Sequence, residues 1–140
     1  MSDYSASVRP GSVTLAGRLL WISAAITAVL TVAAYAGALP FRFSGEAMIS
    51  NFITAALLAL CAAKIGAGRN WARWLMLIIF VLGSLTIPIA LILAPQILQS
   101  IPALLLVVFL LQSAIQIVAL VLAFMPTSRI WFRPPVSAAQ

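Results

Sequence analysis

Four long apolar runs separated by short polar segments fill almost the whole chain. We predict helices over residues 15–39, 47–65, 71–94 and 101–125, followed by an interfacial tail over 126–140. Each run is close to the roughly 20 apolar residues that a helix needs to cross the hydrocarbon core of a bilayer. The pattern therefore predicts an all-α integral membrane protein: one domain, 1–140, folded as a four-helix bundle of two antiparallel hairpins.

Glycine and proline mark the ends of these runs. Gly66 and Gly68 end the second run, Pro40 opens the turn after the first, and Pro126 ends the fourth. These residues are typical of helix stops and turns. After Pro126, an apolar Ile-Trp-Phe triplet flanked by arginines predicts a tail that lies at the membrane interface.

The first apolar run also has features of a cleavable signal peptide. Arg9 and Arg18 precede its uncharged part, and either Ala34-Tyr35-Ala36 or Ala36-Gly37-Ala38 fits a small-x-small cleavage site. However, the run is longer than the apolar core of about 7–15 residues that is usual in signal peptides. We therefore interpret it as a membrane span.

The composition makes lipid the expected solvent for most of the chain. Of 140 residues, 64% are hydrophobic and 7% are charged, whereas a soluble domain carries about 25% charged residues. The net charge of +6 would suggest nucleic acid in a soluble protein. In a membrane chain it instead sets orientation and favours anionic lipid headgroups, so we predict no nucleic-acid partner.

The distribution of the cations predicts the topology. Only Arg42 falls in the turn between the first two runs, and the other cations flank the opposite helix ends: Arg9, Arg18, Lys64, Arg69, Arg73, Arg129 and Arg133. By the positive-inside rule, both termini and the central loop are cytoplasmic. The two hairpins then share one orientation, and the similarity of residues 16–18 to residues 67–69 leaves an internal duplication open.

Missing residue types argue against an enzyme. The chain has no histidine, and its two acidic residues, Asp3 and Glu46, lie outside the predicted spans. Haem or metal ligation by histidine and carboxylate-based chemistry within the membrane are therefore not expected, and we predict no cofactor, no metal and no catalytic residue. Cys61 is the only cysteine, which excludes a dithiol redox centre and predicts a buried structural thiol.

The fourth run contains uncharged polar residues that can act in two ways. Gln112 and Gln116 are four residues apart, so they share one helix face, with Ser113 beside them. We favour a hydrogen-bonded clamp to another helix, because such residues commonly join membrane helices. The expected partners are Ser84 or Thr86 on the third helix, or Thr27 and Thr31 on the first. The alternative is a polar path for a small solute or ion.

Arginine and tryptophan alternate beside the central loop and in the tail. This group consists of Arg69, Trp71, Arg73, Trp74, Arg129, Trp131 and Arg133. Anchoring and orientation in the membrane are the interpretation we favour. A site for anionic lipid headgroups and a docking site for an acidic partner are the alternatives.

The central segment GRNWARW, residues 68–74, and the tail segment SRIWFR, residues 128–133, resemble those of small bacterial inner-membrane proteins with four spans and no assigned activity. The resemblance covers the hydrophobic layout of the whole chain. It implies a bacterial cytoplasmic membrane and a four-helix bundle, and it carries over no functional residue. We therefore expect a non-enzymatic accessory or interaction subunit, or a structural membrane component. The alternative is a small oligomeric pore or transporter with its path at Gln112 and Gln116.

Overall fold

The computed structural model describes residues 9–93, 101–129 and 131–132 of the chain, and every element in this part is helical. The helices are α1 (Gly11–Tyr35), α2 (Gly45–Gly66), α3 (Asn70–Leu93), α5 (Ala103–Phe124) and the short α6 (Pro126–Arg129). The predicted all-α class is confirmed for these residues.

Three of the helices, α1, α2 and α5, are long and apolar enough to cross a membrane. This supports the prediction of a multi-pass membrane protein. Within the described residues α3 provides a shorter apolar stretch, Asn70–Leu85. The predicted fourth span therefore remains a prediction.

The first helix lies about one turn earlier in the chain than predicted. We expected residues 15–39, but α1 begins at Gly11 and ends at Tyr35. Gly37 has a φ of 76°, a left-handed conformation that glycine adopts without steric cost. Its N–H donates to the carbonyl of Ala34 at 3.3 Å, and the N–H of Ala38 donates to that of Ala33 at 2.9 Å. This pair of bonds is a Schellman motif, which ends the helix before the apolar run ends.

The same motif ends α2 at the central loop. Gly68 has a φ of 74°, and its N–H donates to the carbonyl of Ile65 at 3.0 Å. The N–H of Arg69 donates to the carbonyl of Lys64, also at 3.0 Å. The prediction that glycine ends this helix is confirmed, and the left-handed residue is Gly68.

The other predicted boundaries differ from the structure by at most two residues. α2 begins at Gly45 instead of residue 47, because the Ser44 hydroxyl caps it by accepting a hydrogen bond from the Ala47 N–H at 3.2 Å. α3 begins at residue 70 instead of 71 and is described to residue 93, so the predicted end at residue 94 lies outside the described residues. α5 spans 103–124 instead of 101–125, since Pro102 occupies its N-cap position.

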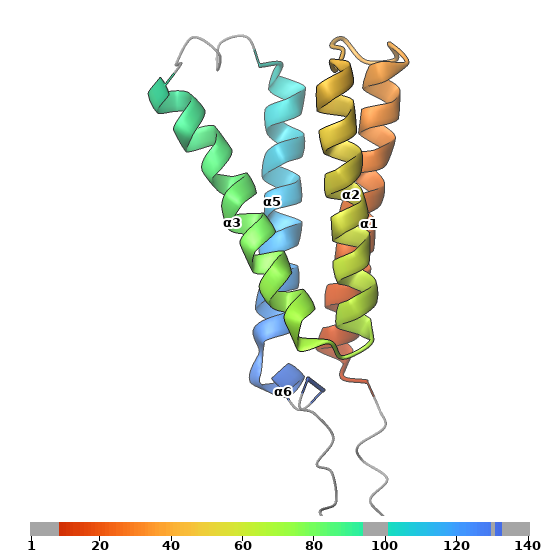
Figure 1. Ribbon diagram of the computed structural model, residues 1–140, viewed down its shortest axis with the longest axis vertical. Helices are drawn as coiled ribbons and strands as arrows, with labels where there is room; N and C mark the ends of the chain where they lie inside the picture. Colours follow the sequence, from red (N-terminus) through yellow and green to blue (C-terminus); the bar gives the residue numbers. More distant parts are fainter. Residues whose placement is uncertain (1–8, 94–100, 130, 133–140) are drawn as a thin grey trace, which may run out of the picture.

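The helices pack around α1 and α5. α1 packs against α2 and α5, and α3 packs against α2 and α5. The α2–α3 loop, the start of α1 and α6 lie at one end of the molecule, and the α1–α2 loop lies at the other, as Figure 1 shows. Toward its C-terminal end α3 leans away from the remaining helices (Figure 1). We call the end that carries α6 the α6 end.

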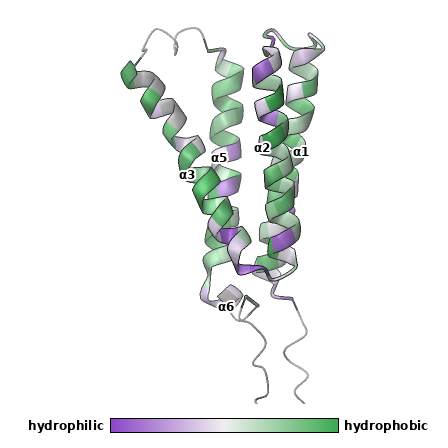
Figure 2. Cartoon of the chain, viewed as in Figure 1, coloured by the Kyte–Doolittle hydropathy of each residue, from purple (hydrophilic) through white to green (hydrophobic). Residues whose placement is uncertain are grey.

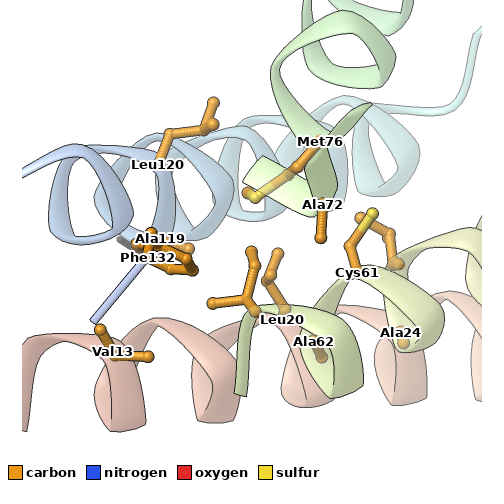
Figure 3. Packing of buried hydrophobic residues seen from close by; sticks show 12 residues of the cluster. Val13, Leu20, Ala24, Cys61, Ala62, Ala72, Met76, Ala119, Leu120 and Phe132 are labelled. Atoms are coloured by element: carbon orange, nitrogen blue, oxygen red, sulfur yellow. The ribbon is translucent and has the colours of Figure 1, made fainter. Parts of the chain in front are cut away.

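The buried core lies in the half of the molecule at the α6 end. Side chains from all four long helices and from the tail meet there (Figure 3). The cluster consists of Val13, Leu20, Ala24, Leu58, Cys61, Ala62, Ile65, Ala72, Met76, Ala119, Leu120 and Phe132. On α3 the buried Ala72 and Met76 contrast with Ile92 and Leu93, which are 79% and 76% exposed. Among the described side chains of α3, those that belong to the core therefore lie in its first half.

Candidate functional site

The two glutamines of α5 form hydrogen bonds with α1. The Gln112 Nε2 donates to the Thr27 Oγ1 at 3.0 Å, and the Gln116 Nε2 donates to the Ser23 Oγ at 3.2 Å. The Gln112 Oε1 lies 3.2 Å from the Thr27 Oγ1 and 3.4 Å from the Ser23 Oγ, both of which can donate to it. These four residues form the α1–α5 polar cluster. It joins helices that are far apart in the sequence.

The threonines of α1 are also bonded within their own helix. The Thr27 Oγ1 lies 3.0 Å from the carbonyl oxygen of Ser23, and the Thr31 Oγ1 donates to the carbonyl of Thr27 at 2.7 Å. Thr27, one of the partners expected from the sequence, thus contacts Gln112, while Thr31 bonds the backbone carbonyl of Thr27 in its own helix. Ser23 was missed, although it lies four residues before Thr27 and is therefore on the same helix face.

Gln112, Ser113, Gln116 and Ser84 line one half-open cavity between the helices. Its volume is ≈ 680 Å³, and all four long helices contribute to its wall. Figure 2 shows hydrophilic positions midway along α5 within an otherwise hydrophobic helix. The structure therefore brings together all four polar residues predicted for the clamp or path. Gln112 and Gln116 form the interhelical bonds, and the two serines only face the cavity.

Arg73 lies between aromatic side chains at the α6 end. Its guanidinium carbon is 5.1 Å from the centroid of the Phe124 ring and 4.7 Å from that of Phe132. These distances fit cation–π contacts. Trp74 packs its ring edge-on against Phe124, with centroids 5.4 Å apart and an interplanar angle of 84°. Arg73 thus joins the start of α3 to the end of α5 and the tail.

The tail is bound to the helices beside this arginine. The Ser128 Oγ, which is fully buried, donates to the carbonyl of Leu122 at 2.7 Å and lies 2.9 Å from the Ser12 Oγ. The backbone N–H of Trp131 donates to the carbonyl of Ser128 at 3.1 Å. A methyl group added to Gly68 would lie 3.1 Å from the Trp131 carbonyl oxygen and 3.2 Å from its Nε1. The tail therefore packs directly on the central loop.

The predicted contact residues divide into a packed and an exposed group. Arg73 and Trp131 are partly buried, whereas Arg69, Trp71 and Trp74 are exposed at the α6 end. Arg129 belongs to α6, and the position of its side chain lies outside the described residues, as does the whole of Arg133. Phe124, Ser128 and Phe132 were not predicted as parts of this site. The two phenylalanines contact Arg73 and Ser128 contacts Ser12, and because these partners are distant in the sequence no local pattern identifies the contacts.

Comparison with known proteins identifies no relative: no family model, no curated protein and no solved structure matches the chain.

Proposed function

We propose that this chain is a four-span, non-enzymatic protein of the bacterial cytoplasmic membrane that acts as an accessory or interaction subunit, or as a structural component. In this proposal α3 is the fourth span, the helices form two antiparallel hairpins, and both termini are cytoplasmic. The distribution of cations supports the orientation: Arg9, Lys64 and Arg69 lie near the α6 end, and Arg42 lies in the loop at the opposite end.

The observation that carries the proposal is the divergence of α3 from the other helices toward its C-terminal end (Figure 1). Among the described side chains in this part of α3, Leu82, Ile92 and Leu93 are 63%, 79% and 76% exposed. A span that diverges from its own bundle offers an apolar face to the helix of another membrane protein or of a second copy of the chain. Meanwhile the most polar side chains of α5 are bonded to α1. They serve helix association more directly than transport.

Purification after mild solubilisation tests the proposal. The tagged full chain should retain a membrane protein, or a second copy of itself, in fixed stoichiometry. Substitution Ile92→Trp on α3 should remove the partner, because a bulky side chain prevents close approach of a helix while remaining apolar. Val29→Trp is the matched control, since Val29 is 66% exposed on α1. Absence of a stoichiometric partner, or equal loss with both variants, would contradict the proposal.

The orientation is tested separately by thiol labelling in intact cells. In a Cys61→Ala background, Ser44→Cys and Ala67→Cys place exposed thiols in the two loops at opposite ends. A membrane-impermeant maleimide should label the Ser44 variant in intact cells and the Ala67 variant only after lysis. The reverse labelling pattern would show that the α6 end, with its cations, lies on the outer side of the membrane.

Binding of anionic lipid headgroups is a further part of the proposal. Arg69, Trp71 and Trp74 are exposed at the α6 end, and each cation near an anionic surface contributes ~1 kcal/mol. Native mass spectrometry should show less retained phosphatidylglycerol for Arg69→Gln than for the control Arg42→Gln at the opposite end. Equal retention by both variants would argue that these residues serve only for anchoring.

A pore or transporter is the second candidate function. It is favoured by the position of Gln112, Ser113, Gln116 and Ser84 around one cavity. In proteoliposomes, a path through the cavity predicts solute or ion flux that is lost in the Gln112→Leu, Gln116→Leu double variant while the fold persists. The first proposal predicts no flux for either protein.

A further inference from the structure

The half-open cavity lies mainly in the half of the molecule that the core does not fill. The buried cluster drawn in Figure 3 lies in the half of the molecule at the α6 end. Toward the other end of the molecule, α3 leans away from the remaining helices (Figure 1). Most of its lining belongs to this second half, including Leu30 of α1, Gly83 of α3 and Leu105 of α5, and the cavity reaches the core at Leu58. Its ≈ 680 Å³ falls within the roughly 300–1,000 Å³ that is typical of small-molecule sites.

The lining of the cavity favours a neutral and mainly apolar occupant. Among the described residues that line it, none is acidic or basic, and most are aliphatic or aromatic. A charged group placed there would lose its hydration without gaining a counter-charge, which is costly at membrane depth. A neutral molecule with a hydrocarbon body meets no such cost.

Three polar side chains nevertheless face this apolar space without hydrogen bonds. Within the described part of the chain, Asn51 of α2, Ser84 of α3 and Ser113 of α5 line the cavity and have no bonded side-chain partner. The α1–α5 polar cluster, by contrast, satisfies Ser23 and Thr27. Since an unpaired polar group in hydrocarbon is destabilising, these three groups are suited to bind hydrogen-bonding atoms of an occupant.

The three groups also lie at similar heights. Measured along the helices at 1.5 Å per residue, Asn51, Ser84 and Ser113 lie between about 16 and 23 Å from the helix ends that flank the α6 end. That level lies within the outer half of a hydrocarbon core about 30 Å thick. They line the same part of the cavity and can therefore contact the polar end of a ligand whose remaining surface is apolar.

We propose that this cavity binds a neutral lipophilic molecule with an uncharged hydroxyl or carbonyl group, held by Asn51, Ser84 and Ser113. The inference rests on the membrane-embedded placement given above as the proposed function, but not on the identity of any partner. The Asn51 amide and the serine hydroxyls supply both donors and acceptors, so either oxygen group can be recognised. The hydrocarbon body packs against the apolar wall.

Three probes with the same hydrocarbon chain test the chemistry. Farnesol carries a neutral hydroxyl, farnesene has no polar group, and farnesyl phosphate is charged. Native mass spectrometry of the full chain, released from detergent with each probe at equal concentration, should show preferential retention of farnesol. The preference over farnesene should be about 3- to 10-fold, as expected for one or two net hydrogen bonds. Equal retention of all three probes, or no retention of farnesol, would overturn the proposal.

Substitutions locate the site. Asn51→Ala and Ser113→Ala should each weaken farnesol retention about 3- to 10-fold. Ser50→Ala is the matched control, because Ser50 is exposed on α2 beside Asn51 and does not line the cavity. Gly83→Phe should abolish retention by filling the space, since Gly83 lines the cavity and a methyl group added there meets no atom within 4 Å. Unchanged retention in Gly83→Phe, or equal losses in Asn51→Ala and Ser50→Ala, would contradict the site.

Membrane insertion is measured on the same preparations. If the chain fractionates with membranes and resists alkaline extraction but retains no farnesol, the ligand proposal fails and the membrane placement stands. If the chain is extracted by alkali, the proposed function fails as well. The two failures are therefore distinguishable.

Discussion

The pairing of Gln112 with Thr27 predicts a measurable coupling energy between α1 and α5. The bond between the Gln112 Nε2 and the Thr27 Oγ1 is 3.0 Å long, whereas the contact of Ser23 Oγ with the Gln112 Oε1 is 3.4 Å and therefore weak. Interhelical hydrogen bonds in membranes contribute about 0.6 kcal/mol on average, with a maximum near 1.7 kcal/mol. Gln112→Leu alone does not isolate this energy, because leucine also adds apolar surface in lipid.

A double-mutant cycle isolates the pairwise interaction. Thr27→Val removes the hydroxyl with little change in shape, so the cycle of Gln112→Leu with Thr27→Val should give a coupling of about 0.6 kcal/mol. The Thr27 hydroxyl can also donate to the carbonyl of Ser23. Loss of that bond belongs to the single Thr27→Val variant and cancels in the cycle. The measurement is the free energy of unfolding in mixed micelles with increasing SDS, followed by far-UV circular dichroism.

Thr54 offers a control cycle within the same cavity. It lines the cavity wall, but its hydroxyl donates to the backbone carbonyl of Ser50 at 3.0 Å and not to Gln112. The cycle of Gln112→Leu with Thr54→Val should therefore give a coupling close to zero. A coupling near zero for Thr27, or one of equal size for Thr54, would refute a direct bond between Gln112 and Thr27.

Three further predictions concern the α6 end and the core. Gly68→Ala should lower the free energy of unfolding by about 1–2 kcal/mol, because it forces alanine into a left-handed conformation against Trp131. The control Gly83→Ala, with open space at its Cβ, should be neutral or stabilise by up to ~1 kcal/mol. A larger loss of stability for Gly83→Ala than for Gly68→Ala in the same unfolding assay would contradict this. Arg73→Gln should lower the free energy of unfolding by about 0.5–2 kcal/mol through loss of two cation–π contacts. Arg69→Gln should change it little. An equal loss of stability in both variants would argue against a packed Arg73. Cys61, fully buried in α2, should react with a permeant maleimide only after unfolding. As the control, Ala63→Cys in a Cys61→Ala background should react in the folded protein. Rapid labelling of Cys61 in the folded protein would show that the core is accessible to the reagent.

The helices were predictable to within one turn, and the largest error has a local cause. Hydropathy alone extends the first helix to Leu39, because Ala36, Gly37 and Ala38 are compatible with an apolar span. The left-handed Gly37 ends the helix at Tyr35 instead. A backbone conformation of this kind does not alter hydropathy, so an apolar run defines a helix better than it defines where the helix ends.

The candidate site was predictable only where chemistry restricted the choice of partner. A glutamine within a span needs a hydrogen-bonding partner, and few residues of the spans can supply one, so Thr27 was among those expected for Gln112. The contact of Arg73 with Phe124 and Phe132 could not be inferred in this way. Phenylalanine is common in spans, and nothing in the sequence distinguishes the ring that an arginine will meet. The cavity was likewise unpredictable, since it depends on the divergence of α3 from the other helices.

The internal hydrogen bonds of α1 have a consequence for synthesis of the protein in a membrane. α1 leaves the ribosome well before α5, so Gln112 and Gln116 are absent when the first span enters lipid. During that interval the hydroxyls of Thr27 and Thr31 can bond the carbonyls of Ser23 and Thr27 within their own helix. The amides of α5 have no such local bond among the described residues and find their partners only by docking on α1. The threonine hydroxyls of α1 can thus be hydrogen-bonded in lipid before α5 is inserted. The glutamines of α5 acquire their hydrogen bonds only when α5 packs against α1.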